Sequence, residues 1–198
     1  NNCPNPIAGV CRTIRQAISQ AAPGDEIRIA MGTYTDLYAT GAFTQAIYVD
    51  ESLSFSGGYS ITNWVDSYPV TQTTVINARD MGRVVYIEDG LTVTLANMML
   101  KNGNAAGFGG GPGGQDAGGI LYNQGANLTL DRVRVAGGAP VYGAASAYGA
   151  GLYHADGDLD IYNTIWHDNQ ATTDGGAVYV ANGALTTFNN TFFDNQAT

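Results

Sequence analysis

The pentapeptide Asp-Asn-Gln-Ala-Thr occurs twice in this chain, at residues 168–172 and again 26 positions later at 194–198. The repeat extends upstream, because Leu159 and Leu185 stand at equivalent positions of the two copies. A whole structural unit that repeats at a fixed step is typical of chains that stack one copy on the next. The sequence therefore predicts a solenoid.

The apolar pattern that opens this repeat also begins at Val93 and at Leu128, with longer spacing between the copies. The extra residues fall in two glycine-rich tracts, at about 103–119 and 137–151. Insertions in a solenoid collect as loops on one flank, which is often the binding flank. We therefore expect any recognition to involve these two tracts.

Between residues 25 and 198 the chain is a series of short β-branched or aromatic runs bounded by Gly, Asn, Asp or Pro. Helices long enough to connect parallel strands in a doubly wound sheet are missing from the pattern. Apolar Leu159 and Ile161 alternate with Asp158 and Asp160, which places one face in a core. The predicted fold class is all-β, a right-handed single-stranded parallel β-helix. An up-and-down barrel or a sandwich is the alternative, although neither needs a fixed-step repeat.

Residues 1–24 are expected to form a cap. An apolar stripe from Ile14 to Ala21 follows Thr13 and stops before Pro23-Gly24, which predicts a short α-helix over 12–22. Such a helix would cover the open end of the first coil. Because the chain stops at the end of a repeat, we expect the coils of 25–198 to continue beyond 198.

Cys3 and Cys11 are the only cysteines, and prolines lie between them. We expect a small disulfide loop, with two free buried thiols as the alternative. A disulfide favours an oxidising setting, so the predicted location is secreted or at the cell surface.

The charge balance limits the partners. Eight Lys and Arg stand against 17 Asp and Glu, a net charge of −9, which disfavours nucleic acid and anionic lipid. No stretch approaches the run of about 20 apolar residues that a membrane-spanning helix needs. The sequence suggests no cofactor.

Asparagines recur at one step of the repeat. Asn97, Asn163 and Asn189 occupy the same position in three copies, where stacked amides can hydrogen-bond to one another. This spacing predicts an asparagine ladder. Arg132 takes the position in the copy between, so we expect the ladder to break or bend there.

The glycine-rich tracts contain the aromatic residues Phe108, Tyr142 and Tyr148. Their flat faces would suit a sugar ring or a protein surface, and the two tracts together would form one contact patch. The alternative is that the aromatic side chains fold back onto the coils and hold the loops in place.

Catalytic and metal sites are not predicted. The only histidines are His154 and His167, and the chain has no adjacent Asp-Asp pair of the kind that polysaccharide hydrolases with this predicted fold use. Three carboxylates at 156–160 fail the calcium-loop spacing. A polysaccharide-active enzyme (a lyase or a glycoside hydrolase), or its inactive carbohydrate-binding relative, stays the alternative function.

Several motifs carry a family resemblance. Residues 11–14, 22–27 and 32–34 resemble the opening of secreted right-handed parallel β-helix repeat proteins. Gly175-Gly176-Ala177-Val178 and Phe192-Phe193-Asp194-Asn195 resemble the GGA(I/L/V) and FxxN repeats of chlamydial polymorphic outer-membrane proteins. The resemblance implies a surface-exposed adhesin stalk.

The predicted function is accordingly non-catalytic. We expect an extracellular or cell-surface protein with a structural or adhesive role, which presents loops to a glycan or surface protein or packs into an extracellular assembly. An uncapped last coil exposes unpaired strand edges, so self-association through the open end is also expected.

Overall fold

The computed structural model describes residues 10–137 and 147–198. Its helices are one α-helix, α1 (Ile14–Ile18), and one turn of 3-10 helix, η1 (Pro112–Gly114). Strands make up most of the rest: β1 (Glu26–Ala30), β2 (Gly32–Tyr34), β3 (Tyr38–Thr40), β4 (Phe43–Val49), β5 (Ser54–Tyr59), β6 (Thr74–Asn77), β7 (Arg83–Lys101), β8 (Leu121–Ala136), β9 (Leu152–His154), β10 (Leu159–Tyr162), β11 (Ile165–His167), β12 (Gln170–Ala171), β13 (Val178–Val180), β14 (Leu185–Phe188), β15 (Thr191–Phe193) and β16 (Gln196–Ala197). The predicted all-β class is confirmed.

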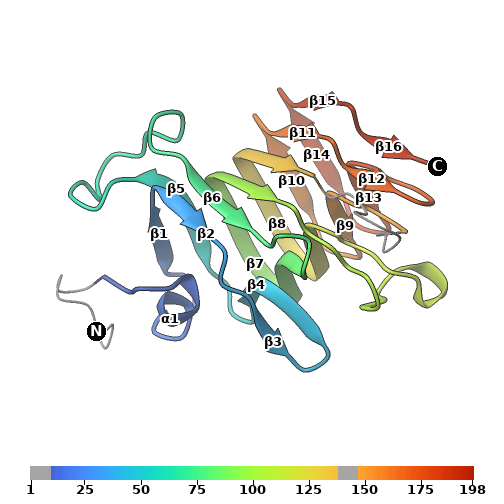
Figure 1. Ribbon diagram of the computed structural model, residues 1–198, viewed down its shortest axis with the longest axis horizontal. Helices are drawn as coiled ribbons and strands as arrows, with labels where there is room; N and C mark the ends of the chain where they lie inside the picture. The colour runs from blue at the N-terminus through green and yellow to red at the C-terminus, as the bar shows by residue number, and fades with distance from the viewer. Residues whose placement is uncertain (1–9, 138–146) are drawn as a thin grey trace.

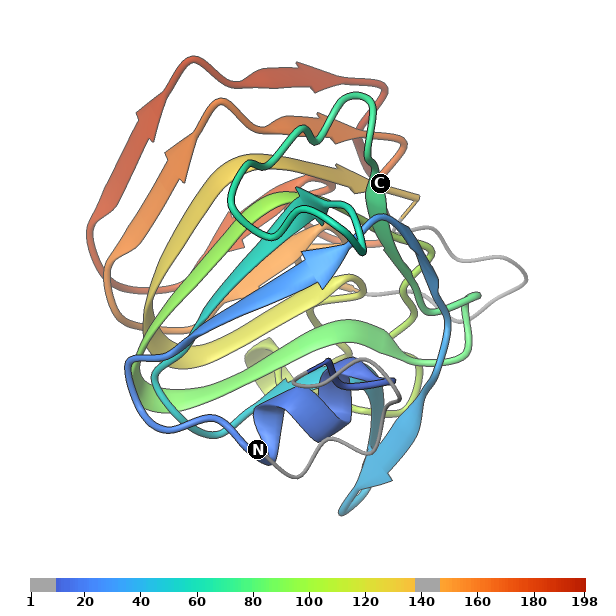
Figure 2. The same cartoon turned by 90° about the vertical axis from the view of Figure 1, so that its left-hand side faces the viewer.

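The strands pair in parallel with strands that come later in the chain, in the order β1-β5-β7-β8-β10-β14. The chain thus makes successive passes across the sheet: β1–β2, β4–β6, β7, β8, β9–β12 and finally β13–β16, which we call the last pass. Figure 1 shows the passes side by side, and Figure 2 shows that the strands surround a common interior. Only the β3–β4 hairpin is antiparallel among the described strand pairs.

Like residues meet like residues in the interior because the passes stay in register. Phe55, Leu95, Leu130 and Ile161 are paired one above another in four passes, and all are fully or almost fully buried. Burying each such side chain stabilises the fold by roughly 1.5–3 kcal/mol. The apolar alternation in the sequence therefore generates one continuous core.

Two strands, β7 and β8, are much longer than the short runs of the sequence indicate. The two apolar runs at 83–87 and 91–95 form a single bent strand, β7, because β8 continues to pair with it on both sides of a register shift between Asp89 and Thr92. Gly90 has a positive φ of 70°, so the backbone bends there, and pairing with β8 resumes at Thr92.

The chain turns corners at left-handed residues that recur from pass to pass. Arg132, Asn163 and Asn189 have φ between 52 and 55°, and Asn97 has φ 58°. A second row of corners includes the first residue of each copy of the repeated pentapeptide, Asp168 and Asp194. Asn and Asp adopt this conformation more readily than other L residues, which explains why they mark the repeat.

The N-terminal end of the stack is covered by two segments. Thr13 caps α1 and accepts a hydrogen bond from the backbone of Gln16, and Ile14 is buried against the core. The α-helix ends at Ile18, earlier than the predicted 12–22, because Ser19 already caps its carbonyls and Pro23-Gly24 follows closely. With five residues, α1 is far too short to cross a membrane, and no other α-helix is found in the described ranges.

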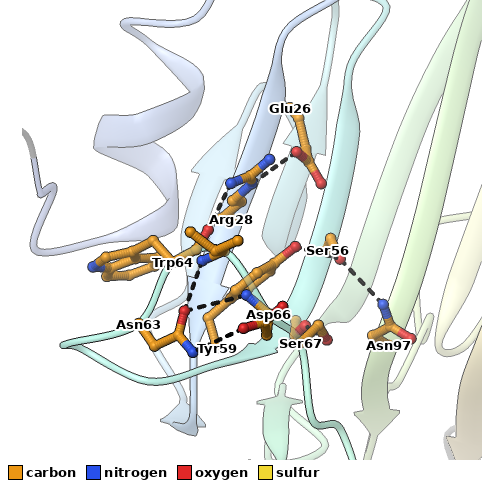
Figure 3. A network of polar contacts seen from close by, with 11 residues as sticks. Glu26, Arg28, Ser56, Tyr59, Asn63, Trp64, Asp66, Ser67 and Asn97 are labelled. Atoms are coloured by element: carbon orange, nitrogen blue, oxygen red, sulfur yellow. Dashed lines mark hydrogen bonds and ion pairs between the residues drawn. The ribbon is translucent and has the colours of Figure 1, made fainter.

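The second covering segment is residues 60–73, which is tied to β1 (Figure 3). Arg28 on β1 donates a 2.6 Å hydrogen bond to the carbonyl of Trp64 and pairs with Glu26 at 2.8 Å. The Trp64 ring stacks on Tyr59, with 6.2 Å between ring centroids. The first strand therefore carries a fixed loop at its side.

Cys3 lies outside the described residues, so the Cys3–Cys11 disulfide stays a prediction. The same holds for most of the second glycine-rich tract, since residues 138–146 are outside the described ranges.

Candidate functional site

A column of tyrosines runs along the outer face of the sheet. Tyr48, Tyr86, Tyr122, Tyr153 and Tyr179 are paired one above another in β4, β7, β8, β9 and β13. Neighbouring rings are stacked, with centroids 5.2 to 5.7 Å apart. Each stacked pair adds about 0.5–1.5 kcal/mol beyond the burial of area. We call this set the tyrosine column.

Three hydroxyls of the column donate hydrogen bonds to the protein. Tyr48 donates to Glu88 at 2.6 Å, Tyr86 donates to Gln124, and Tyr122 donates to the carbonyl of Gly110 at 3.0 Å. Burial raises the pKa of Tyr86 to about 12. At neutral pH the Tyr86 hydroxyl is therefore uncharged.

Arg83 is buried beside this column although no carboxylate forms an ion pair with it in the described part of the chain. Its guanidinium carbon lies 4.6 Å from the ring centroid of Tyr122, and Phe43, Tyr86 and Phe108 lie within 5.7 Å. Such cation–π contacts stabilise a desolvated cation. Burial lowers the pKa of Arg83 to about 10, so the side chain stays charged at neutral pH.

The first glycine-rich tract is fastened by Arg83. The guanidinium donates to the carbonyls of Gly109, Ala117 and Gly118 at 2.9 to 3.2 Å. From within the tract, the Asp116 carboxylate accepts hydrogen bonds from two backbone amides, at 2.7 and 2.9 Å. Gly110 must be glycine, because an added Cβ would lie 2.6 Å from the Tyr122 ring. The tract is thus folded onto the tyrosine column.

The predicted contact residues follow the same pattern. Phe108 is half-buried and meets Phe43 edge-on, with centroids 5.9 Å apart. Tyr148 is half-buried and meets Tyr179 edge-on at 5.2 Å. Tyr142 lies outside the described residues. Phe108 and Tyr148 therefore pack onto the column, as the fold-back alternative expects, and the described residues give no support to one outward patch.

The predicted asparagine ladder has two separate parts. Asn189 donates to Asn163 at 2.8 Å, and Asn163 donates to Asp131 at 3.0 Å. On the other side, Arg132 donates to Asn97 at 2.8 Å, and Asn97 donates to Ser56 at 3.2 Å. The row of amides is interrupted at Arg132.

A second amide pair was not predicted. Asn169 and Asn195, inside the two copies of the pentapeptide, are joined by a 2.8 Å hydrogen bond between their side chains. Asn195 also donates to the carbonyl of Trp166 at 2.8 Å. The repeated pentapeptide was the sequence signal for this pair, because identical residues one repeat step apart stack directly and their amides can hydrogen-bond to each other.

Both histidines have both ring nitrogens occupied. In His154, which is buried, Nδ1 accepts from Asn123 at 2.8 Å and Nε2 donates to the carbonyl of Gly157 at 2.9 Å. Burial lowers the pKa of His154. His167 donates from Nδ1 to Asp168 at 2.7 Å and accepts from Arg134 at 2.8 Å. Within the described ranges, no three His, Cys, Asp or Glu side chains are grouped as metal ligands.

The last pass exposes side chains that the previous pass buries. Leu159 and Trp166 are fully buried, whereas their register partners Leu185 and Phe192 are 48% and 52% exposed. Phe193 is also exposed, although its ring stacks on His167 at 4.9 Å. Because β14 ends the strand order, its outer edge is unpaired as well. The last pass presents both an apolar surface and a strand edge.

No family model, curated protein or solved structure matches this chain. Among the described residues, the last pass combines exposed large apolar side chains with an unpaired strand edge.

Proposed function

We propose that this chain is a right-handed parallel β-helix scaffold of an extracellular or cell-surface assembly, with a structural or adhesive role and no catalytic one. The observation that carries the proposal is the exposed last pass. Leu185 and Phe192 are half exposed, and covering them would contribute about 1 kcal/mol each. A further strand laid on β14 would satisfy its unpaired edge.

The partner that we propose is a second copy of this chain, stacked head to tail. Residues 147–198 carry six Asp and no Lys or Arg, so the C-terminal end is anionic. Residues 10–73, which include the cap helix, the first strands and the covering segment, carry three Arg against six acidic residues. Both ends are therefore acidic, so the contact would be held by apolar surface and strand pairing against a charge repulsion.

The N-terminal end also offers an apolar surface to such a partner. Ile61, Val65 and Val70 in the covering segment are exposed, and so is Met31 after β1. Figure 2, which faces this end, shows the segment in front of the strands. A head-to-tail contact joins two different surfaces and does not close, so it extends into a filament.

The histidines support a non-catalytic role. A histidine can act in general acid–base catalysis only if one of its ring nitrogens reaches the substrate, and the four ring nitrogens of His154 and His167 are all engaged by the protein. Incubation with a panel of polysaccharides is accordingly expected to release no reducing or unsaturated ends. Released product would overturn this part of the proposal.

The assembly is tested by sedimentation velocity of the whole chain over a range of concentrations at low and high salt. We expect the weight-average mass to rise with concentration and also with salt, because salt screens the repulsion between two acidic ends. Phe192→Asp should abolish the rise. Ile165→Asp, at an exposed apolar position of the preceding pass, is the matched control and should leave it unchanged.

The orientation is tested by Val65→Asp at the opposite end. Head-to-tail stacking predicts that this change also weakens association, and that mixing it with Phe192→Asp restores dimers but no longer species. A chain that stays monomeric at every concentration would refute self-association. Association weakened by Phe192→Asp alone would refute the head-to-tail arrangement.

A further inference from the structure

A cavity of about 370 Å³ lies beneath the cap helix. Its lining comes from α1, the end of β2, the segment that leads into β3, and single residues of β4 and β6. Small-molecule sites have volumes of about 300–1,000 Å³. This one is at the lower end, which suits a ligand of the size of one amino acid rather than a nucleotide or an oligosaccharide.

The floor of the cavity is apolar. Ile14, Ala46 and Ile76 are buried and contribute aliphatic surface from three different elements. A sugar would have to turn some of its hydroxyls toward this floor, where they would lose their hydrogen bonds. The floor therefore favours a compact hydrocarbon group.

The walls are two tyrosines, and each hydroxyl has a backbone hydrogen-bond partner. Tyr34 donates to the carbonyl of Ala30 at 3.0 Å, and the Tyr38 hydroxyl accepts a 3.0 Å bond from the Tyr48 amide. Burial raises the pKa of both hydroxyls, which keeps them uncharged at neutral pH. The walls thus present ring surface, and they add no charge.

The charged groups of the lining are one cation and one anion. Arg15 and Asp36 both line the cavity and are both exposed. The Arg15 guanidinium lies 4.5 Å from the Tyr38 ring centroid, which fixes it over one wall. Arg15 can only donate hydrogen bonds and Asp36 can only accept them. A ligand head that satisfies both groups must itself carry an acceptor and a donor.

We propose that this cavity binds a small zwitterion with a branched aliphatic body, of the class of the apolar α-amino acids. The hydrocarbon body would occupy the floor of Ile14, Ala46 and Ile76. The carboxylate would pair with Arg15 and the ammonium group with Asp36. This site is independent of the assembly through the last pass.

Isothermal titration of the whole chain with L-leucine tests the proposal. We expect saturable binding with one site per chain. The two analogues that each lack one charge, 4-methylpentanoate and 3-methylbutylamine, should bind at least about tenfold more weakly, because each loses a charge-assisted hydrogen bond. Equal affinity for either analogue would overturn the assignment of the head group.

Variants locate the site. Arg15→Gln and Asp36→Asn should each weaken leucine binding by about tenfold or more. Arg12→Gln and Asp66→Asn are the matched controls, since both residues are exposed and neither lines the cavity, and they should bind as the wild type does. Ala46→Leu should abolish binding by filling the floor. If that variant fails to fold, as judged by circular dichroism, the two surface variants decide the location. No binding to the wild type at about 10 mM leucine, or wild-type binding in Arg15→Gln and Asp36→Asn, would overturn the proposal.

Discussion

Replacing Arg83 by methionine should loosen the first glycine-rich tract and destabilise the whole fold. Methionine keeps most of the aliphatic length but removes the donors to the carbonyls of Gly109, Ala117 and Gly118. Hydrogen bonds to a charged group contribute about 1.5–3 kcal/mol each, so three acceptors account for roughly 5–9 kcal/mol. The change also removes the contacts of the guanidinium with the surrounding rings.

The opposing effect is desolvation. A pKa lowered from 12.5 to about 10 means that holding the buried charge costs about 3 kcal/mol, and methionine relieves that cost. The balance is a loss of roughly 2–6 kcal/mol. For a chain of this length, we expect the melting temperature to fall by at least about 4 °C.

Two measurements check the Arg83→Met prediction. Urea unfolding gives the loss of stability, and chymotrypsin cleavage after Phe108 reports whether the tract has come away from the tyrosine column. Arg79→Met is the control, because Arg79 is exposed and its guanidinium donates to Thr35 alone among the described residues. An Arg83→Met protein that is as stable as the wild type, and is cleaved no faster, would show that desolvation outweighs the hydrogen bonds and that Arg83 does not hold the tract.

Two further predictions concern the corners and the tyrosine column. Gly118 and Gly90 have nearly the same φ, 66° and 70°, but an added Cβ would lie 2.7 Å from the Leu121 carbonyl at the first and meet nothing within 4 Å at the second. Gly90→Ala should therefore cost about 1 kcal/mol of unfolding free energy and Gly118→Ala more than about 2 kcal/mol, and equal losses in urea unfolding would contradict this reasoning. Burial raises the pKa of Tyr86 from 10.0 to about 12. The buried, protonated hydroxyl therefore contributes its full share to the free energy of unfolding below pH 10, and this share is lost as the pH rises toward 12. The loss is about 2–3 kcal/mol, so Tyr86→Phe should flatten the fall in stability over this interval, and an unchanged slope would argue against burial as the cause.

The repeat made the parallel arrangement predictable. Leu159 and Leu185 are separated by one repeat step and are register partners in β10 and β14, as the spacing required. The pairing of Asn163 with Asn189 was predictable for the same reason, and a direct hydrogen bond joins their side chains. Where the step is regular, sequence distance converts directly into spatial position.

The site around Arg83 could not be predicted in this way. Its contacts with Gly109 and Ala117 depend on how an insertion folds back, and insertions lie outside the repeat that sets the register. The alignment of Tyr86 with Tyr122 crosses the same insertion, so its partner was not visible from spacing alone. The antiparallel β3–β4 hairpin likewise interrupts the repeat.

The order of the strands determines how the protein would respond to a pull on its ends. Since β1 and β14 are at opposite ends of the strand order, tension between them acts along the hydrogen bonds that join neighbouring passes. Such bonds open one row at a time instead of shearing together, and each pass contacts mainly its neighbours. The molecule should therefore yield in small steps beginning with the last pass, at low force, while the middle of the stack, where β7 pairs with β8 along most of their lengths, separates last.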